Sequence, residues 1–349
     1  MSISNVISLL SGVALFLFGM ALMGDGLKKV AGNKLELVLY KLTNTPIKGV
    51  LLGTVVTAII QSSSATTVMV VGFVNSGMMK VAQAIGIIMG ANIGTSVTGW
   101  ILCLSYIDGS SGIAQLLSTA TISAVVAIIG ITFKMFVKKT TYKNVGDIML
   151  GFAILMVGMQ TMSGAVSPLK ENPHFVNMLT KVENPIVGIL MGMVFTAIIQ
   201  SSSASVGILQ ALAVSGVIGL DSAAFILFGQ NIGTCVTAMI SAIGAKKNAK
   251  RAALVHLYFN IIGTLVFMCL FYLVNAFIHF EFLSQGATPV GIATIHSVFN
   301  IFATIILLPF GKGLEKLACL SVRDDKEREE KFAAALKNAF NSQDGAAKN

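Results

Sequence analysis

The sequence predicts an all-α polytopic membrane protein, built from two inverted-topology repeats that each contain a re-entrant helical hairpin and a broken transmembrane helix. Three observations lead to this fold class. Of the 349 residues, 55% are hydrophobic and only 11% are charged, whereas soluble domains carry about 25% charged residues. Several apolar stretches reach the roughly 18 residues that cross a bilayer as a helix. The stretch TAIIQSSSA, from Thr57 to Ala65, also recurs from Thr196 to Ala204.

The recurrence extends far beyond that stretch. At the same offset the chain aligns with itself without a gap from Gly12 and Gly151 to Ile101 and Ile240. The segment from Gly53 to Ile101 has 23 identities in 49 positions with its counterpart. Self-similarity at a fixed period is the mark of a duplicated structural unit. The chain therefore consists of two homologous halves.

Each half has the same expected plan. The segment around QSSS has about 34 residues, and two full crossings need about 40, so we expect a re-entrant hairpin with QSSS at its tip. The NIGT-x-VT stretch predicts a helix that breaks at the same depth, where non-helical backbone survives only if it is buried or lines a cavity. The expected segments are a first repeat, 1–145 (hairpin 46–79, broken helix 82–105); a second repeat, 146–278 (hairpin 185–218, broken helix 222–243); an extra span, 288–310; and a charged cytoplasmic tail, 311–349.

Basic residues predict the orientation. With seven full spans, at about 5–24, 82–105, 113–136, 146–165, 222–243, 252–278 and 288–310, one side of the membrane holds 22 of the 24 Lys and Arg residues. Basic loops face the cytoplasm, so we expect a plasma (inner) membrane protein with its N-terminus outside and its C-terminus inside. The repeats would then be inverted. The formal charge of +9 is explained by these loops, and no nucleic acid partner is expected.

The two QSSS tips have the chemistry of an anion site. Backbone N–H groups at the start of a half-helix and the helix dipole favour negative charge. Inverted repeats with interrupted helices are typical of secondary transporters, whose ligand binds near the midplane between the repeats. A small tetrahedral oxyanion such as phosphate fits six hydroxyls around one point. The candidate phosphate-binding residues are Gln61, Ser62, Ser63, Ser64, Gln200, Ser201, Ser202 and Ser203.

Sodium is the expected coupling ion. No Lys or Arg lies within the expected core spans to balance an anion, and a hard cation bound by hydroxyl, carboxamide and carbonyl oxygens can do so. Proton coupling would favour a carboxylate at depth, and only His256 and His296 titrate in the spans. The candidate oxygen ligands are Asn92, Thr95, Thr98, Asn231, Thr234 and Thr237. The alternatives are that the hydroxyls join helices and that the asparagines cap helix ends.

Two stretches near the end of the chain, HLYFN from His256 to Asn260 and HSVFN from His296 to Asn300, share a spacing. Their His and Asn lie four residues apart and therefore on one helical face. Packing with a buried hydrogen bond is one interpretation. A supporting role behind the binding site, for His256 and Asn260, is the other.

At QSSSATT, at IIMGANIGTSVT (Ile87–Thr98) and at ALVHLYFN (Ala253–Asn260), the sequence resembles the type II sodium–phosphate cotransporter family, over residues 10 to 310. The resemblance implies Na⁺-driven phosphate uptake, with phosphate at Gln61 to Ser64 and at Gln200 to Ser203. It implies Na⁺ near Gln200, Ser201, Thr234 and Thr237, with Asn92, Thr95 and Thr98 close by.

Two departures from the family pattern concern the sodium ions. Animal members have an H-x-x-F-N and an acidic stretch after the first NIGT segment, and SSGIAQLLSTATISAV (110–125) has neither. Gln230 stands where a small hydroxyl residue is usual. The number of coupled ions is therefore not carried over.

Three other functions remain open at this point. A sodium-coupled symporter of another anion, namely arsenate, sulfate or a carboxylate, would keep the mechanism. A membrane hydrolase would pair a serine with His256, but it lacks an acidic orienter at depth. A pure anion channel or phosphate sensor would not depend on sodium. No cofactor and no enzymatic activity are expected; the expected partners are phosphate, Na⁺ and the bilayer, and the oligomeric state is not predicted.

Overall fold

The computed structural model describes residues 3–32, 45–106, 119–168, 182, 184–280 and 285–323. In this part of the chain the regular elements are helices, apart from one isolated β-bridge between Gly219 and Gly286. Six of the helices are long and apolar enough to cross a membrane. The prediction of an all-α polytopic membrane protein is therefore confirmed.

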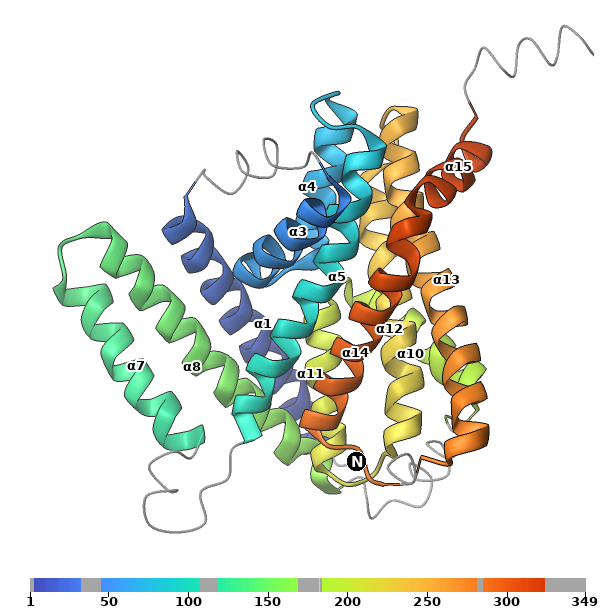
Figure 1. The fold of residues 1–349 in the computed structure, drawn as a ribbon. Coiled ribbons are helices and arrows are strands. Elements are labelled where there is room, and N and C mark those ends of the chain that lie inside the picture. Colours follow the sequence, from blue (N-terminus) through green and yellow to red (C-terminus); the bar gives the residue numbers. More distant parts are fainter. Residues whose placement is uncertain are drawn as a thin grey trace, which may run out of the picture.

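The first layer consists of three helices, α1 (Ile3–Ala31), α7 (Thr119–Phe136) and α8 (Thr140–Val166), which lie on the left in Figure 1. α1 and α8 approach closely because glycines of each face the backbone of the other. A Cβ on Gly19 would lie 2.4 Å from the Leu155 nitrogen, and one on Gly158 would lie 2.5 Å from the Phe16 nitrogen. These contacts correspond under the 139-residue repeat, so α1 and α8 pack as equivalent elements.

Two helical hairpins follow where the sequence predicts them. α3 (Pro46–Ile60) and α4 (Ser63–Asn75) form the first, and α10 (Pro185–Ile199) and α11 (Ser202–Val214) form the second. Each helix begins or ends at the QSSS stretch and has 15 or 13 residues, which is too short to cross a bilayer alone. The first hairpin lies in the upper half of Figure 1 and the second in the lower half.

The helices that carry the NIGT stretches differ from the expectation. α5 (Val81–Cys103), which continues into the 3-10 turn η1 (Leu104–Tyr106), and α12 (Leu220–Ser241) are continuous helices. The expected breaks within 82–105 and 222–243 are therefore corrected.

The glycines of the NIGT helices explain the difference, because they serve close packing. A Cβ on Gly90 would lie 2.0 Å from the Val50 carbonyl oxygen, and one on Gly229 would lie 2.0 Å from the Ile189 carbonyl oxygen. The threonines bond within their helices as well: the hydroxyl of Thr95 donates to the carbonyl of Ala91 at 3.0 Å. Such i to i−4 bonds are compatible with an intact helix.

The C-terminal elements pack with the hairpins and the NIGT helices, and together these form the second layer. They are α13 (Lys247–Ile278), α14 (Pro289–Leu307), the 3-10 turn η5 (Leu308–Phe310) and α15 (Gly311–Ser321). α15 begins the segment expected as a tail, and it packs into the core through Leu314 and Ala318. The rest of that segment beyond residue 323 lies outside the described residues, as does the start of the span expected at 113–136.

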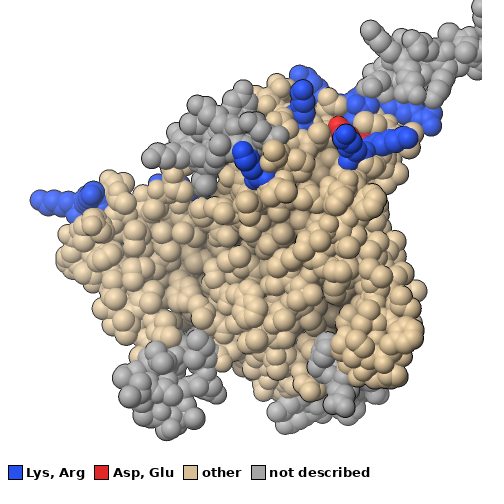
Figure 2. Space-filling view, in the orientation of Figure 1, with Lys and Arg blue, Asp and Glu red and all other residues tan. Residues whose placement is uncertain are grey.

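Basic side chains gather at one end of the molecule. In the view of Figure 2, Lys and Arg lie along the upper edge, and the middle of this face has none. Lys80 and Lys246 precede α5 and α13, and Lys134 and Lys139 lie at the turn between α7 and α8. Lys170 and Lys181, which were expected on the opposite side, lie outside the described residues.

Candidate functional site

Each hairpin turns at the glutamine of its QSSS stretch. Gln61 ends α3 with φ 58°, and Gln200 ends α10 with φ 57°. A left-handed conformation at a residue other than glycine is uncommon. The same conformation at both equivalent positions shows that the two turns are built alike.

The serines after each glutamine begin the second helix of the hairpin. The Ser62 hydroxyl accepts a bond from the Ala65 nitrogen at 3.1 Å, and the Ser201 hydroxyl accepts one from the Ala204 nitrogen at 3.2 Å. Each serine is therefore an N-cap. The caps leave other first-turn N–H groups of α4 and α11 without a partner in their own helices.

The two tips meet. The hydroxyl oxygens of Ser63 and Ser202 lie 3.4 Å apart, although the residues are separated by 139 positions in the chain. Both side chains are buried. Two helix N-termini therefore converge on one place, where their dipoles reinforce each other toward an anion.

Hydroxyl pairs brace each hairpin just behind its tip. Thr57 bonds to Thr66 at 3.0 Å, and Thr196 bonds to Ser205 at 3.0 Å. Each pair joins the end of the first hairpin helix to the start of the second. The sequence interpretation overlooked these residues, although all four lie at equivalent positions of the repeat and that equivalence could have identified them.

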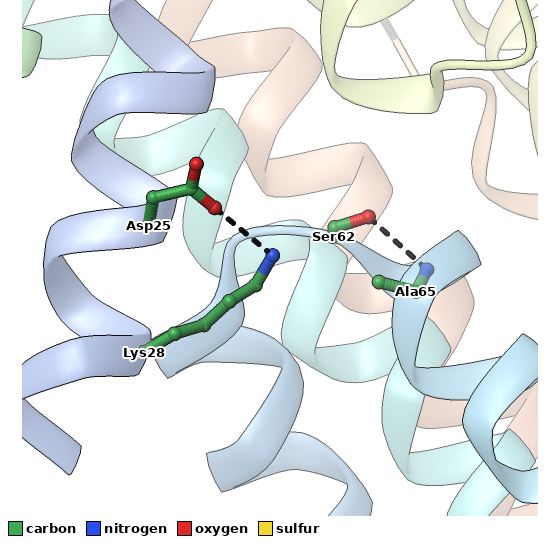
Figure 3. Close-up of polar contacts among 4 residues, drawn as sticks. All are labelled: Asp25, Lys28, Ser62 and Ala65. Carbon is green, nitrogen blue, oxygen red and sulfur yellow. Dashed lines mark hydrogen bonds and ion pairs between the residues drawn. The ribbon is translucent and has the colours of Figure 1, made fainter. Parts of the chain in front are cut away.

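The two tips differ in their exposure. Gln61 is buried and Gln200 is exposed, while the serines that follow them, Ser62 and Ser201, are both half-buried. α1 covers the first tip, since a Cβ on Gly24 would lie 3.0 Å from the Ile60 carbonyl oxygen. The next residue of α1, Asp25, forms an exposed ion pair with Lys28 at 3.4 Å, which Figure 3 shows beside the Ser62 turn. In this conformation, access to the two tips is therefore unequal.

The asparagines of the NIGT stretches bind to the late helices. The Asn92 amide nitrogen donates to the Asn260 carbonyl oxygen at 2.8 Å, and the Asn92 carbonyl oxygen lies 3.3 Å from Nε2 of His256. All three side chains are buried. The Asn260 amide nitrogen donates to the His256 backbone oxygen, which leaves the Asn260 side-chain oxygen to accept from the Asn92 amide nitrogen. The Asn92 side-chain oxygen then faces His256. Because that oxygen can only accept, Nε2 of His256 is the donor.

The second half repeats this arrangement. The Asn231 amide nitrogen donates to the Asn300 carbonyl oxygen at 3.3 Å, and the Asn231 carbonyl oxygen lies 3.1 Å from Nε2 of His296. The shared spacing of HLYFN and HSVFN thus reflects two equivalent sites. His296 and Asn300 belong with His256 and Asn260, although the sequence interpretation gave a supporting role only to the first pair.

Each of these clusters also reaches the opposite repeat. The Asn260 amide nitrogen donates to the Cys235 sulfur at 3.3 Å, and the Asn300 amide nitrogen donates to the Ser96 hydroxyl at 2.9 Å. Cys235 and Ser96 are equivalent positions of the two repeats. Through Asn260, α13 therefore links Asn92 of the first repeat by hydrogen bonds to α12 of the second. Through Asn300, α14 likewise links Asn231 of the second repeat to α5 of the first.

Among the other predicted ligands of the NIGT helices, some hydroxyls form hydrogen bonds within the protein and others do not. Thr234 donates to the Gln230 backbone oxygen at 2.8 Å, while the Thr237 hydroxyl is buried without a hydrogen-bond partner in the described structure. The side-chain oxygens of Gln61 and Gln230 are also buried and unpartnered there. Thr98 of α5 is buried; of the predicted phosphate ligands in the hairpins, Ser203 of α11 is buried and Ser64 of α4 is half-buried. Unpartnered buried oxygens are costly unless a water or an ion binds them.

The arrangement of the histidines differs from that of a serine hydrolase. His256 and His296 direct Nε2 to asparagines, and in the described part of the chain neither histidine bonds to a serine of the tips. The same residues contain no group of three or more His, Cys, Asp or Glu that could hold a metal ion. What the site does offer is two converging helix N-termini and buried side-chain oxygens without partners, which are groups that bind ions.

Comparisons with known proteins agree with that chemistry. A sequence model described as Na+/Pi-cotransporter matches residues 15–164 and 169–289. The uncharacterized protein YqeW of Bacillus subtilis is 31% identical over 305 residues, which cover 87% of this chain and 94% of YqeW. No solved structure matches significantly.

Two further relatives have names that mention phosphate. YjbB of Escherichia coli, named for inorganic phosphate export, is 26% identical over 93% of this chain, which spans 57% of the length of YjbB. Sodium-dependent phosphate transport protein 2A of sheep is 35% identical over 117 residues, which are 33% of this chain and 18% of that protein.

Proposed function

From the premise that the chain belongs to the Na+/Pi-cotransporter family, we propose that it is a sodium-coupled symporter of inorganic phosphate in the plasma membrane. It binds phosphate between the two QSSS tips and works by alternating access. The phosphate-binding set is Gln61 to Ser64 with Gln200 to Ser203.

The observation that carries this proposal is the contact between Ser63 and Ser202 at 3.4 Å. It brings together two helix N-termini and two buried hydroxyls from separate repeats. A tetrahedral oxyanion can accept hydrogen bonds from donors on both sides, which a site on one hairpin could not offer. The unequal exposure of Gln61 and Gln200 supports a conformation open to one side, as alternating access requires.

The binding of sodium is supported by the helices that end at each tip. α3 and α10 end at the tips, so their last carbonyl groups lie next to the helix starts that favour the anion. C-terminal ends of half-helices are suited to Na⁺. The set proposed from the sequence is Gln200, Ser201, Thr234, Thr237, Asn92, Thr95, Thr98 and Asn231. Within that set the Thr237 hydroxyl is buried and unpartnered, and the unpartnered buried oxygens of Gln61 and Gln230 add two further side-chain ligands.

The membrane orientation follows from the charges. If the basic end in Figure 2 faces the cytoplasm, the first hairpin enters from inside and the second from outside. The repeats then have inverted topology, with the N-terminus outside and the C-terminus inside. The two hairpins would expose the shared site to opposite sides in turn.

The direction of transport depends on the gradients. A relative is named for phosphate export, and a coupled carrier works in either direction when the sodium gradient is reversed. We propose inward transport as the default because the sodium gradient of a cell is inward.

Radiolabelled phosphate uptake into proteoliposomes tests the proposal. An inward Na⁺ gradient is expected to give concentrative uptake, and replacing Na⁺ by K⁺ is expected to abolish it. Ser63→Ala and Ser202→Ala should each reduce uptake at least tenfold, since a lost charge-assisted hydrogen bond costs about 1.5–3 kcal/mol. Ser76→Ala, at an exposed serine whose hydroxyl caps the end of α4, is the matched control.

Two results would overturn the assignment. Uptake that is indifferent to sodium would identify a channel or uniporter. Sodium-dependent uptake of radiolabelled sulfate or arsenate, with no transport of phosphate, would assign another anion to the same site.

A further inference from the structure

A large cavity lies away from the QSSS tips, between α12, α13 and α14. Its volume is about 830 Å³, and its walls are mostly apolar, with Phe225 and Phe228 of α12, Phe267 and Phe271 of α13, and Phe302 of α14. This volume is within the range of small-molecule sites, about 300–1,000 Å³. Nothing in the proposed transport mechanism uses it.

The equivalent place in the first repeat is filled by the protein itself. Ala224 lines the cavity, and its counterpart in the repeat is Ile85. α15 covers Ile85, since a Cβ on Gly311 would lie 3.6 Å from Ile85, and Leu314 of α15 is buried in the same cluster. The same groove between the helices is thus closed by α15 in one half and open in the other.

A single residue accounts for the difference. The alignment of HLYFN with HSVFN places Pro309, in the turn η5 between α14 and α15, opposite Cys269 in the middle of α13. Proline interrupts a helix, so the chain bends there and α15 packs against α13. α13 has no such break, remains a helix of 32 residues, and diverges from α14 toward the lower end of Figure 1.

The open groove faces the hydrocarbon region. Leu270 and Val274 of α13 and Val298 of α14 line the cavity and are 40–51% exposed. In a membrane protein such side chains contact lipid. The apolar part of the cavity beside them suits an acyl chain.

One end of the cavity is polar. Asp221, at the start of α12, lines it together with Asn275 and His279 at the end of α13. The Asp221 carboxylate accepts from the Ser222 nitrogen at 2.6 Å, and within the described residues it forms no ion pair. The rings of Phe225 and Tyr272 stack beside it with centroids 6.5 Å apart. A carboxylate next to aromatic faces attracts an ammonium group, and an imidazole N–H can donate to a phosphate oxygen.

We propose that this cavity, the α12–α14 cavity, binds one phospholipid with a zwitterionic, amine-bearing headgroup. An acyl chain occupies the aromatic part in the position that α15 occupies in the other half. The ammonium group pairs with Asp221, and the lipid phosphate lies toward His279. Because Asp221 is at the end of α12 remote from the basic residues at Lys246, the lipid comes from the leaflet opposite the basic face.

Native mass spectrometry of the detergent-purified full chain tests the proposal. Phosphatidylethanolamine and phosphatidylglycerol with the same acyl chains are titrated separately. We expect one retained phosphatidylethanolamine, bound about tenfold more tightly than phosphatidylglycerol, since one favourable ion pair in a partly desolvated site is worth about a factor of ten.

Two variants distinguish the binding of the lipid acyl chain from the recognition of its headgroup. Val298→Trp narrows the cavity from an exposed position and should remove binding of both lipids. Asp221→Asn should remove only the preference for phosphatidylethanolamine. Glu315→Gln on α15, which makes the same charge change at the basic end, is the matched control and should behave as the wild type.

The proposal is overturned if Val298→Trp retains the lipid as the wild type does, or if the two headgroups bind equally in the wild type. Ala224→Phe fills the cavity from α12 and checks the first result independently. A fall in melting temperature on removal of phosphatidylethanolamine, present in the wild type and absent in Val298→Trp, would support the site. Neither readout requires transport, so failure here leaves the proposed function untouched.

Discussion

The Asn92 side chain uses both ends of its amide, with Asn260 on one side and His256 on the other. Both partners are fully buried. In such surroundings a polar atom that loses its partner cannot recover it from water. The network therefore fixes the side chains in one arrangement.

Asn92→Ala is expected to lower the free energy of unfolding by about 1–3 kcal/mol for each partner left unsatisfied. Asn231→Ala should have the same effect in the second half. Thermal unfolding in detergent measures the change. Thr141→Ala, at an exposed residue near the start of α8, should stay within about 0.5 kcal/mol of the wild type, and equal losses in all three variants would contradict the account.

Cys235 and Ser96 are expected to be interchangeable as acceptors because they occupy equivalent positions, each bonded by an asparagine amide of a late helix. Cys235→Ser should retain stability and phosphate uptake. Cys235→Ala removes the sulfur acceptor without adding atoms to the buried site, and should cost about 1–3 kcal/mol. Indistinguishable melting curves for the two variants would show that the contact with Asn260 carries no energy.

At the scale of elements, glycines set the distance between each hairpin and its NIGT helix. A Cβ on Gly53 would lie 2.2 Å from the Ile87 carbonyl oxygen, and one on Gly192 would lie 2.0 Å from the Ile226 carbonyl oxygen. Helices in a bilayer gain stability from such close contact, because lipid provides little hydrophobic driving force between them. The contact also holds the Thr57–Thr66 and Thr196–Ser205 pairs in place behind the tips.

Gly90→Ala and Gly229→Ala are therefore expected to separate hairpin and helix. Backbone atoms stand 2.0 Å from either new methyl group, so the loss should exceed the roughly 1–3 kcal/mol of ordinary overpacking. Folded yield and melting temperature report it. Gly164→Ala in α8, where nothing lies within 4 Å, should instead stabilise by about 0.5–1 kcal/mol, and an equal loss there would show that the losses at Gly90 and Gly229 do not come from close packing.

The elements differ in how well the sequence predicts them. The hairpins and their turn at QSSS follow from length and from the repeat, because polar residues at the end of two short apolar arms leave few alternatives. The NIGT stretches were interpreted as helix breaks because glycine and threonine disfavour helix. Tertiary packing overrides that preference at Gly90 and Gly229. The contacts of Asn92 and Asn231 with the late helices join distant segments, and one sequence without homologues does not reveal such pairings.

At the scale of the whole molecule, the contacts behind the hairpin tips and at the two NIGT asparagines occur in both halves. The halves differ in the exposure of Gln61 and Gln200, in the side chains at the equivalent positions Ala91 and Gln230, and in the groove that α15 closes on one side only. The proposed alternating access needs two conformations of similar energy, and a two-fold arrangement with local differences is suited to it.

The inverted orientation can be tested with two matched cysteines. Met78→Cys and Val217→Cys occupy equivalent positions after the two hairpins, in a variant from which the four native cysteines have been removed. A membrane-impermeant maleimide should label Met78→Cys only from the cytoplasmic side and Val217→Cys only from outside. Labelling of both positions from the same side would contradict the inversion.

The central claim is that the two tips form one phosphate site. Equilibrium binding of radiolabelled phosphate to the purified protein in sodium tests it most directly. The account predicts one phosphate per chain, lost in Ser63→Ala and equally lost in Ser202→Ala, because donors from both tips bind the same anion. Two phosphates per chain, or a variant of one tip that retains the binding of the other, would show that the tips act separately.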